Sequence, residues 1–210
     1  MRLHGYYRST ASWRVRIVLN LKGVRAEHQA HHLRHGAQRT ADYLRLNPQG
    51  LVPTLELDDG TPLTQSLAIC EWLDEIFPEP PLLPGDALDR AKIRAFAFAI
   101  ACDVHPVQNL KVLDRLRALK VPEDHVTAWA RWVIEDGLEA CQKLLPSASG
   151  PFCFGDRPTL GDVCLVPQLF NARRFGADLG GFDRLLQAEA SCRNLPAFAN
   201  AAPERQPDAQ

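Results

Sequence analysis

The sequence predicts two domains, a small α/β unit with a mixed four-stranded sheet followed by an all-α unit. Two observations lead to this prediction. Residues 77–86 contain four prolines and a glycine, a density that neither a helix nor a central strand tolerates. Short apolar runs alternate with helical stretches before this segment, whereas every stretch after it has helical periodicity. We therefore expect a first domain at residues 1–80, a linker at 81–86 and a second domain at 87–210.

The first domain is predicted to contain a strand, a helix and a strand, then a polar helical stretch, a hairpin and a last helix. Trp13, Ile17 and Leu21 recur at helical spacing, and Gly23 ends that helix. Asp58-Asp59-Gly60 is a hairpin signal. A strand–helix–strand unit pairs its strands in parallel and a hairpin pairs them antiparallel, so the sheet is mixed. Strands are expected at residues 2–7, 27–33, 53–57 and 61–64, and helices at 10–22, 34–46 and 66–77.

The second domain is predicted to consist of helices alone. The first is long and has a bend at Pro106. Pro122 suits the first turn of the next, because the N–H that proline lacks has no helical partner there. Thr159 and Asp162 form a start that resembles a capping box, with Asp in place of the usual Glu. Helices are expected at residues 87–119, 122–145, 159–175 and 183–190, before a proline-rich polar tail that we expect to be loose.

Composition and charge exclude several classes of function. Lys and Arg number 24 against 25 Asp and Glu, so there is no basic excess for binding nucleic acid or an anionic membrane surface. The longest apolar run, residues 95–102, is far shorter than the roughly 20 residues of a spanning helix. The N-terminus lacks the apolar stretch of a signal peptide. We expect no nucleic-acid partner, no membrane partner and a cytoplasmic location.

The cysteines and histidines predict neither disulfides nor a metal site. The six cysteines form no C-x-x-C pair, so we interpret them as small buried side chains in a reducing compartment. Four histidines cluster at His28, His31, His32 and His35. Alternation along a strand would point them to opposite faces, which favours a solvated edge over a zinc site.

Several stretches resemble one known family. Residues 7–17, Tyr-Arg-Ser-Thr-Ala-Ser-Trp-Arg-Val-Arg-Ile, resemble the signature of the zeta-class glutathione transferases, whose usual form is R-S-S-C-S-W-R-V-R-I. Residues 47–55 and 65–69 are similar to the two glutathione-binding stretches of the wider family, and 105–110, 171–175 and 205–208 also match the class. The resemblance covers essentially the whole chain. It implies the glutathione transferase architecture, with a thioredoxin-like first domain, a helical second domain that contributes the substrate pocket, and glutathione as cofactor.

The resemblance assigns a set of residues to glutathione. Ser9 lies where a strand passes into a helix, and a hydroxyl beside the free N–H groups of a first turn favours an anion. The implied role is to stabilise the glutathione thiolate; the alternative is that Ser9 only caps the helix. Ser66 is implied to bind the γ-glutamyl carboxylate. The full set is Ser9, Thr10, Ala11, Ser12, Trp13, Arg14, Gln38, Gln49, Val52, Pro53, Gln65, Ser66, His105, Asn109, Leu110 and Lys111.

Some members of this set carry a more specific expectation. The resemblance implies a cis Val52–Pro53 peptide bond, with the Val52 backbone pairing with the cysteinyl part of glutathione. Gln38 and Gln49 are weaker candidates, since either can be a surface amide. Ala11 stands where the class often has cysteine, which removes a second nucleophile or acid. A continuous helix would place His105 and Asn109, four residues apart, on one face; we do not assign His105 as a general base.

Arg8 and Arg174 are the candidates for binding substrate and are predicted to be catalytic together with Ser9. Maleyl keto acids carry two carboxylates, which guanidinium groups bind in a planar, two-pronged manner. Arg8 adjoins Ser9 directly, and Arg174 falls on a helix of the second domain. Arg173 is one helical step of about 100° away and should face elsewhere.

The activity that the resemblance implies is a glutathione-dependent cis–trans isomerisation, maleylacetoacetate to fumarylacetoacetate, in aromatic amino-acid catabolism. Maleylpyruvate isomerisation in gentisate-type aromatic degradation is the first alternative, since that enzyme belongs to the same class. A zeta-class transferase of detoxification would differ only in the apolar wall of its substrate pocket. A non-catalytic binding module is disfavoured by the intact glutathione set. The family layout also predicts a homodimer.

Overall fold

The computed structural model describes residues 1–146 and 150–210, which form two compact units. The first unit comprises Met1–Leu82 together with Arg193–Gln210, and the second comprises Leu83–Cys192. The division after Leu82 falls inside the proline-rich segment. The sequence placed the C-terminal residues from 193 onward in the second domain, whereas the structure packs them into the first unit.

The first unit contains a mixed four-stranded sheet, as predicted. Its strands are β1 (Arg2–Gly5), β2 (Glu27–Ala30), β3 (Thr54–Glu56) and β4 (Pro62–Thr64), in the order β2-β1-β3-β4. β1 pairs in parallel with β2 and antiparallel with β3, and β3 pairs antiparallel with β4. The first strand is shorter than predicted, because the backbone turns after Gly5 and the Ser9 N–H bonds to the Tyr6 carbonyl at 2.9 Å.

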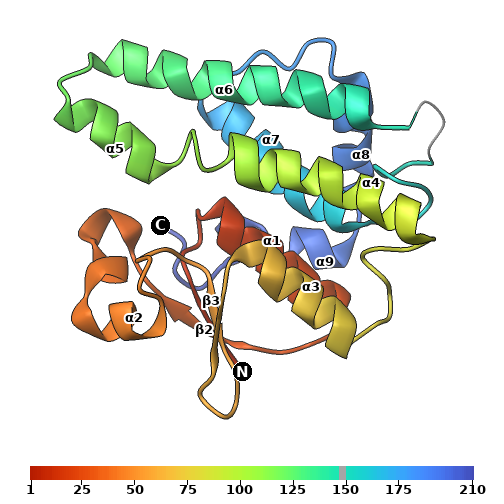
Figure 1. Cartoon of the computed structure of the whole chain (residues 1–210), viewed down its shortest axis with the longest axis horizontal. Helices are drawn as coiled ribbons and strands as arrows, with labels where there is room; N and C mark the ends of the chain where they lie inside the picture. The colour runs from red at the N-terminus through yellow and green to blue at the C-terminus, as the bar shows by residue number, and fades with distance from the viewer. Residues whose placement is uncertain (147–149) are drawn as a thin grey trace. The chain divides into compact units, whose positions relative to one another are not determined.

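The helices of the first unit are α1 (Thr10–Leu21), α2 (Ala41–Leu46), α3 (Ser66–Ile76) and the short α9 (Pro196–Ala199). α1 packs against α3 and against α9 (Figure 1). Its residues from Thr10 to Leu19 are all buried. α2 is shorter than the predicted helix. Two 3₁₀ turns precede it, and Gly36 between them has a φ of 73°, which interrupts a regular helix.

The C-terminal segment is not the loose tail that we expected. Phe198, Ala201 and Pro203 are buried. The Asn20 side chain donates to the Ala197 carbonyl at 2.9 Å, so the segment is held to α1. Three buried apolar residues, spread among proline and polar residues, therefore give this segment a packed position.

The second unit is helical throughout its described elements, with α4 (Ala87–Phe98), α5 (Leu110–Ala118), α6 (Glu123–Leu144), α7 (Leu160–Arg174) and α8 (Asp183–Arg193). The single helix predicted at residues 87–119 is interrupted. α4 continues as a π-helical segment, Ala99–Val104, and turns then lead to α5. Gly137 of α6 lies against that segment, since a Cβ there would be 2.0 Å from a methyl group of Val104.

The start of α7 confirms the predicted capping box. The Thr159 hydroxyl accepts from the Gly161 N–H at 3.3 Å, and the Asp162 carboxylate accepts from the Thr159 N–H at 2.8 Å. Asp162 is fully buried and also accepts from the Cys153 N–H at 2.9 Å, and this burial raises the pKa of its carboxyl group. Among the described residues, no helix is long and apolar enough to cross a membrane.

Candidate functional site

The N-terminus of α1 is arranged to face an anion. Ser9 is its N-cap, and its Oγ accepts from the Ser12 N–H at 3.2 Å, so the capping role left open by the sequence is present. The same hydroxyl carries a hydrogen that can be donated outward. The first turn contains no acidic residue, and the half-buried Arg8 directly precedes Ser9. Free N–H groups and a hydroxyl therefore meet at this helix terminus, and an arginine precedes it in the sequence.

The next side chains of this turn lie deeper. Thr10, Ser12 and Trp13 are all buried. Ser12 packs against β1, since a Cβ at Gly5 would lie 3.3 Å from its Oγ. The family resemblance includes Ser12 in the glutathione set. In the structure its backbone N–H donates to the Ser9 cap, and its buried hydroxyl lies close to β1.

Arg14 is the feature that most clearly indicates a ligand. Its side chain is 1% exposed, and Nη1 donates to Ser66 Oγ, at the start of α3, at 3.2 Å. Nε and Nη2 have no hydrogen-bond partner among the residues that the structure describes. Buried charged groups are normally paired, because desolvation is costly. A guanidinium with two unmatched donors beside a helix N-terminus suits a carboxylate.

Gln65 stands next to this pair in an unusual conformation. It precedes α3 with a φ of 68°, which is rare for a residue other than glycine. Its Nε2 donates to Gln49 Oε1 at 2.8 Å, so two of the predicted residues, from separate loops, are joined. Strained backbone of this kind clusters at functional sites.

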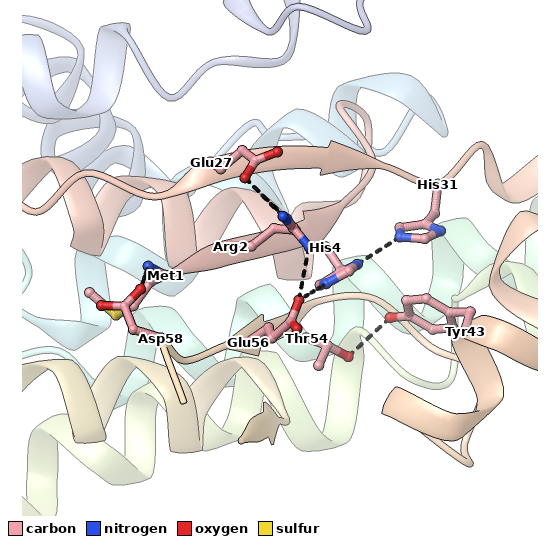
Figure 2. Close-up of polar contacts among 9 residues, drawn as sticks. All are labelled: Met1, Arg2, His4, Glu27, His31, Tyr43, Thr54, Glu56 and Asp58. Carbon is pink, nitrogen blue, oxygen red and sulfur yellow. Dashed lines mark hydrogen bonds and ion pairs between the residues drawn. The ribbon is translucent and has the colours of Figure 1, made fainter. Parts of the chain in front are cut away.

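The loop before β3 is held by residues that the sequence analysis did not select. Tyr43 Oη donates to the Leu51 carbonyl at 2.6 Å and lies 3.1 Å from Thr54 Oγ1; Figure 2 shows the Tyr43–Thr54 contact. Asn47 Nδ2 donates to the same carbonyl at 2.8 Å. The Val52–Pro53 peptide bond that follows is cis, as the resemblance implied. The sequence resemblance singled out residues 47–55, but it did not show which side chains hold the loop.

Gln38 lies beside this loop. Gly50 has a φ of 62°, and a Cβ there would lie 3.2 Å from the Gln38 carbonyl oxygen, so glycine permits a close approach. The Gln38 side chain is buried, and its Nε2 donates to the Leu33 carbonyl at 3.4 Å. It is therefore an interior amide rather than the surface amide that was the alternative.

The clustered histidines lie on and beyond the edge strand β2, where His35 is exposed and His28, His31 and His32 are partly buried. His31 also enters a polar network. The His4 ring lies between Glu56 and His31, with nitrogen–oxygen and nitrogen–nitrogen distances of 3.0 and 2.9 Å (Figure 2). Burial and the neighbouring His4 lower the pKa of His31 to about 4. The His32 and His35 rings stack on each other at 3.8 Å. In the part of the chain that the structure describes, no cluster of three or more metal-ligating side chains forms.

The second unit contains the remaining predicted residues. Asn109 is the N-cap of α5, where its Oδ1 accepts from the Leu110 N–H at 2.7 Å, and Lys111 follows on an exposed position. His105 precedes a run of turns, so it does not share a continuous helical face with Asn109. That expectation was wrong because the helix is interrupted between the two residues.

The two adjacent arginines at the end of α7 differ in their surroundings. Arg173 forms a two-pronged ion pair with the buried Glu189 of α8, at 2.6 and 2.5 Å. Arg174 is exposed, and its guanidinium carbon lies 5.2 Å from the centre of the Phe175 ring. The Arg173 guanidinium is thus bound by a carboxylate of the chain itself.

The fold and this site together define a class. A β2-β1-β3-β4 sheet with a cis-proline loop and an anion-binding helix N-terminus is a thioredoxin-like unit, joined here to a helical unit. The chain belongs to the glutathione S-transferase family. The family's N-terminal domain model matches residues 8–76, and its C-terminal domain model matches residues 64–191.

Curated relatives cover the whole chain. A probable maleylacetoacetate isomerase from Vibrio cholerae serotype O1 is 46% identical over 99% of this chain and 97% of its own length. A maleylacetoacetate isomerase from Pseudomonas aeruginosa is 44% identical over 99% and 98% of the two chains. A maleylpyruvate isomerase from Ralstonia sp is 44% identical over 99% of each.

Solved structures agree with these relatives. A holo structure of maleyl pyruvate isomerase, a bacterial zeta-class enzyme, has a TM-score of 0.97 at 43% identity and covers both chains completely. A maleylacetoacetate isomerase from Anaeromyxobacter dehalogenans with bound GSH in the active site has a TM-score of 0.90 at 45% identity, covering 100% of this chain and 97% of that one. The zeta-class resemblance seen in the sequence is confirmed.

Proposed function

We propose that this chain is a glutathione-dependent cis–trans isomerase that converts maleylacetoacetate to fumarylacetoacetate. The observation that carries the proposal is the buried Arg14–Ser66 pair, whose unmatched guanidinium donors lie in the same unit as the Ser9 helix terminus. A carboxylate site and a thiolate site in one thioredoxin-like unit suit a tripeptide thiol. The named isomerases at 44–46% identity over 99% of the chain support the same assignment.

The residues of the first unit fit glutathione in a specific way. We assign Arg14 and Ser66, with the first turn of α3, to the γ-glutamyl carboxylate. Gln65 and Gln49 provide amide groups beside that site. The Val52 backbone is assigned to the cysteinyl part, and its loop is fixed through the Leu51 carbonyl, which accepts from Tyr43 and Asn47.

Catalysis is assigned to the turn at the start of α1. When bound, glutathione supplies the thiolate that adds to the cis double bond and leaves again after rotation about the resulting single bond. Ser9 donates its hydroxyl hydrogen toward the sulfur, and the positive end of α1 favours the charged form. We assign Arg8 and Arg174 to the two carboxylates of the substrate.

Maleylpyruvate is a second candidate substrate, and one observation supports it. The maleylpyruvate isomerase relative is 44% identical, the same value as one of the maleylacetoacetate isomerases. The experiment is to measure kcat/KM of the purified protein for both acids with glutathione present, and for a chlorodinitrobenzene-type electrophile. We expect the maleylacetoacetate value to exceed the other two. A higher value for the electrophile would favour a detoxifying transferase.

We further propose a homodimer and a cytoplasmic location. The commonest closed symmetry of soluble oligomers is two-fold. None of the six cysteines forms a disulfide within the described residues, and all but Cys102 are buried, which suits a reducing compartment. Light scattering at micromolar concentration tests the dimer, and a monomeric mass would contradict it. Fractionation of the source cells tests the location.

A further inference from the structure

The sequence motif Arg205-Gln206-Pro207-Asp208 has no place in the function proposed so far. In the structure it ends the C-terminal segment that packs into the first unit. The Gln206 side chain holds this segment together, since its Nε2 donates to the carbonyls of Asn200 and Ala202 at 3.0 and 2.9 Å. The motif therefore occupies a defined position, and its last side chain reaches another part of the unit.

That side chain contacts the turn that precedes Ser9. The Tyr7 N–H donates to Asp208 Oδ2 at 3.0 Å, a contact that joins residues 201 positions apart in the sequence. Asp208 Oδ1 lies 3.7 Å from His28 Nδ1 on β2. The carboxylate is largely buried, with 15% of the side chain exposed. A buried carboxylate on a single backbone N–H fixes that peptide group in one orientation.

Arg16 of α1 holds the same turn from its carbonyl side. It is 5% exposed, and its guanidinium donates to the carbonyls of Tyr7 at 3.0 Å, Tyr6 at 3.5 Å and Ala201 at 3.0 Å. Burial lowers the pKa of Arg16 to about 10, and the charge of Asp208 opposes that shift. The two side chains thus form an oppositely charged clasp around the Tyr6–Tyr7 turn, with Ala201 tying the C-terminal segment into it.

We propose that Asp208 is a positioning residue for the thiolate site, acting through the Tyr7 peptide group on Arg8 and Ser9. The Tyr6 carbonyl held by Arg16 also accepts from the Ser9 N–H at 2.9 Å, so the clasp is continuous with the helix cap. This inference rests on the proposed function, because it assigns Asp208 a role in placing the Ser9 hydroxyl. The glutathione-binding pair Arg14 and Ser66 lies outside the clasp.

The two halves of the site therefore respond differently to loss of Asp208. Misplacing Ser9 lowers the fraction of bound glutathione that is in the reactive thiolate form, so kcat falls. Ground-state binding of glutathione through Arg14 and Ser66 is retained, so KM for glutathione changes little. A role limited to anchoring the C-terminal segment would lower thermal stability without this split between kcat and KM.

The experiment compares Asp208→Ala and Asp208→Asn with Gln206→Ala in the full chain. Gln206→Ala is the matched control, because it removes the bonds to the Asn200 and Ala202 carbonyls and leaves the Asp208 carboxylate that contacts Tyr7 in place. We expect Asp208→Ala to lower kcat by about 10-fold with KM for glutathione within about 2-fold. Asp208→Asn keeps an oxygen that can accept from Tyr7 and should recover part of kcat. Gln206→Ala should keep kcat within about 2-fold of the unmodified protein.

Hydrogen exchange provides a second readout that is independent of activity. Asp208→Ala should speed exchange of the amides of residues 7–9 by about 10-fold or more, and Gln206→Ala should not. If the unmodified protein turns over a maleyl acid but Asp208→Ala keeps more than half of kcat, the positioning role is wrong and the proposed function stands. If the unmodified protein shows no turnover of either acid, both fail.

Discussion

Replacing Arg14 by methionine should weaken glutathione binding without weakening the fold. The change removes the guanidinium and keeps most of the buried stem. Nε and Nη2 are the two donors left without partners in the described residues, and each is assigned to the γ-glutamyl carboxylate. A hydrogen bond to a charged group contributes about 1.5 kcal/mol at the lower end of its range, so two contribute about 3 kcal/mol. This corresponds to about a 100-fold increase in Kd.

Stability without ligand should behave in the opposite way. Arg14→Met removes a buried charge whose desolvation opposes folding by several kcal/mol. The one bond that is lost, to Ser66, stabilises by about 1 kcal/mol. The free energy of unfolding in the absence of glutathione should therefore stay the same or rise. Isothermal titration with glutathione and denaturant unfolding of the ligand-free protein measure the two quantities separately.

Lys22→Met is the matched contrast. Lys22 follows the other end of α1, and its buried Nζ is satisfied by Asp74 Oδ1 at 2.6 Å and by the Pro80 carbonyl at 2.5 Å. Removing one partner of such a pair leaves a buried charge and should destabilise the fold by about 3 kcal/mol. Glutathione affinity should stay within about 2-fold. The reasoning is refuted if Arg14→Met binds glutathione as tightly as the unmodified protein.

Three further predictions test the other assignments. Ser9→Ala should lower kcat by about 100-fold with the fold intact, because the bound thiol loses the hydroxyl that favours its thiolate form; turnover within about 2-fold would refute the role. Arg8→Lys and Arg174→Lys should each lower kcat/KM by about 10-fold or more. Arg173→Lys keeps a positive charge beside Glu189 and should keep its activity; a damaged Arg173→Lys beside a normal Arg174→Lys would show the assignment reversed. The free energy of unfolding should decrease as the pH is lowered from 6.5 to about 4. In this range the unfolded chain protonates His31, whereas the folded chain, in which the His31 pKa is about 4, does not. For this half-buried ring we expect about 1–2 kcal/mol, and His31→Gln should flatten the pH profile of unfolding.

Local patterns predicted most of the fold. The periodicity of Trp13, Ile17 and Leu21 located α1, and the hairpin signal at Asp58–Gly60 located the β3–β4 pair. The sequence did not predict the interruption of the helix expected at residues 87–119. Periodicity from Ala87 onward does not distinguish an α-helix from an α-helix that passes into a π-helical segment. The close approach of Gly137 that accompanies the segment is a tertiary contact, and no local pattern reports it.

The sequence named residues of the candidate site, but it did not show which of them contact one another. The motifs contained Ser9, Arg14, Gln65 and Ser66, yet no spacing rule links Arg14 to Ser66 across 52 residues. Sequence analysis did not select Tyr43 and Asn47, because their role is to bind the Leu51 carbonyl. That contact depends on how α2 lies against the following loop. The C-terminal segment was misplaced because its few apolar residues are spread among proline and polar residues.

The most direct test of the central assignment is to assay purified protein for cis–trans conversion of maleylacetoacetate, with and without glutathione. Conversion is followed by the appearance of fumarylacetoacetate, and Ser9→Ala is run beside the unmodified protein. The proposed function predicts rapid turnover that requires both glutathione and Ser9. Turnover that persists without glutathione, or no turnover of either maleylacetoacetate or maleylpyruvate with millimolar glutathione present, would contradict it.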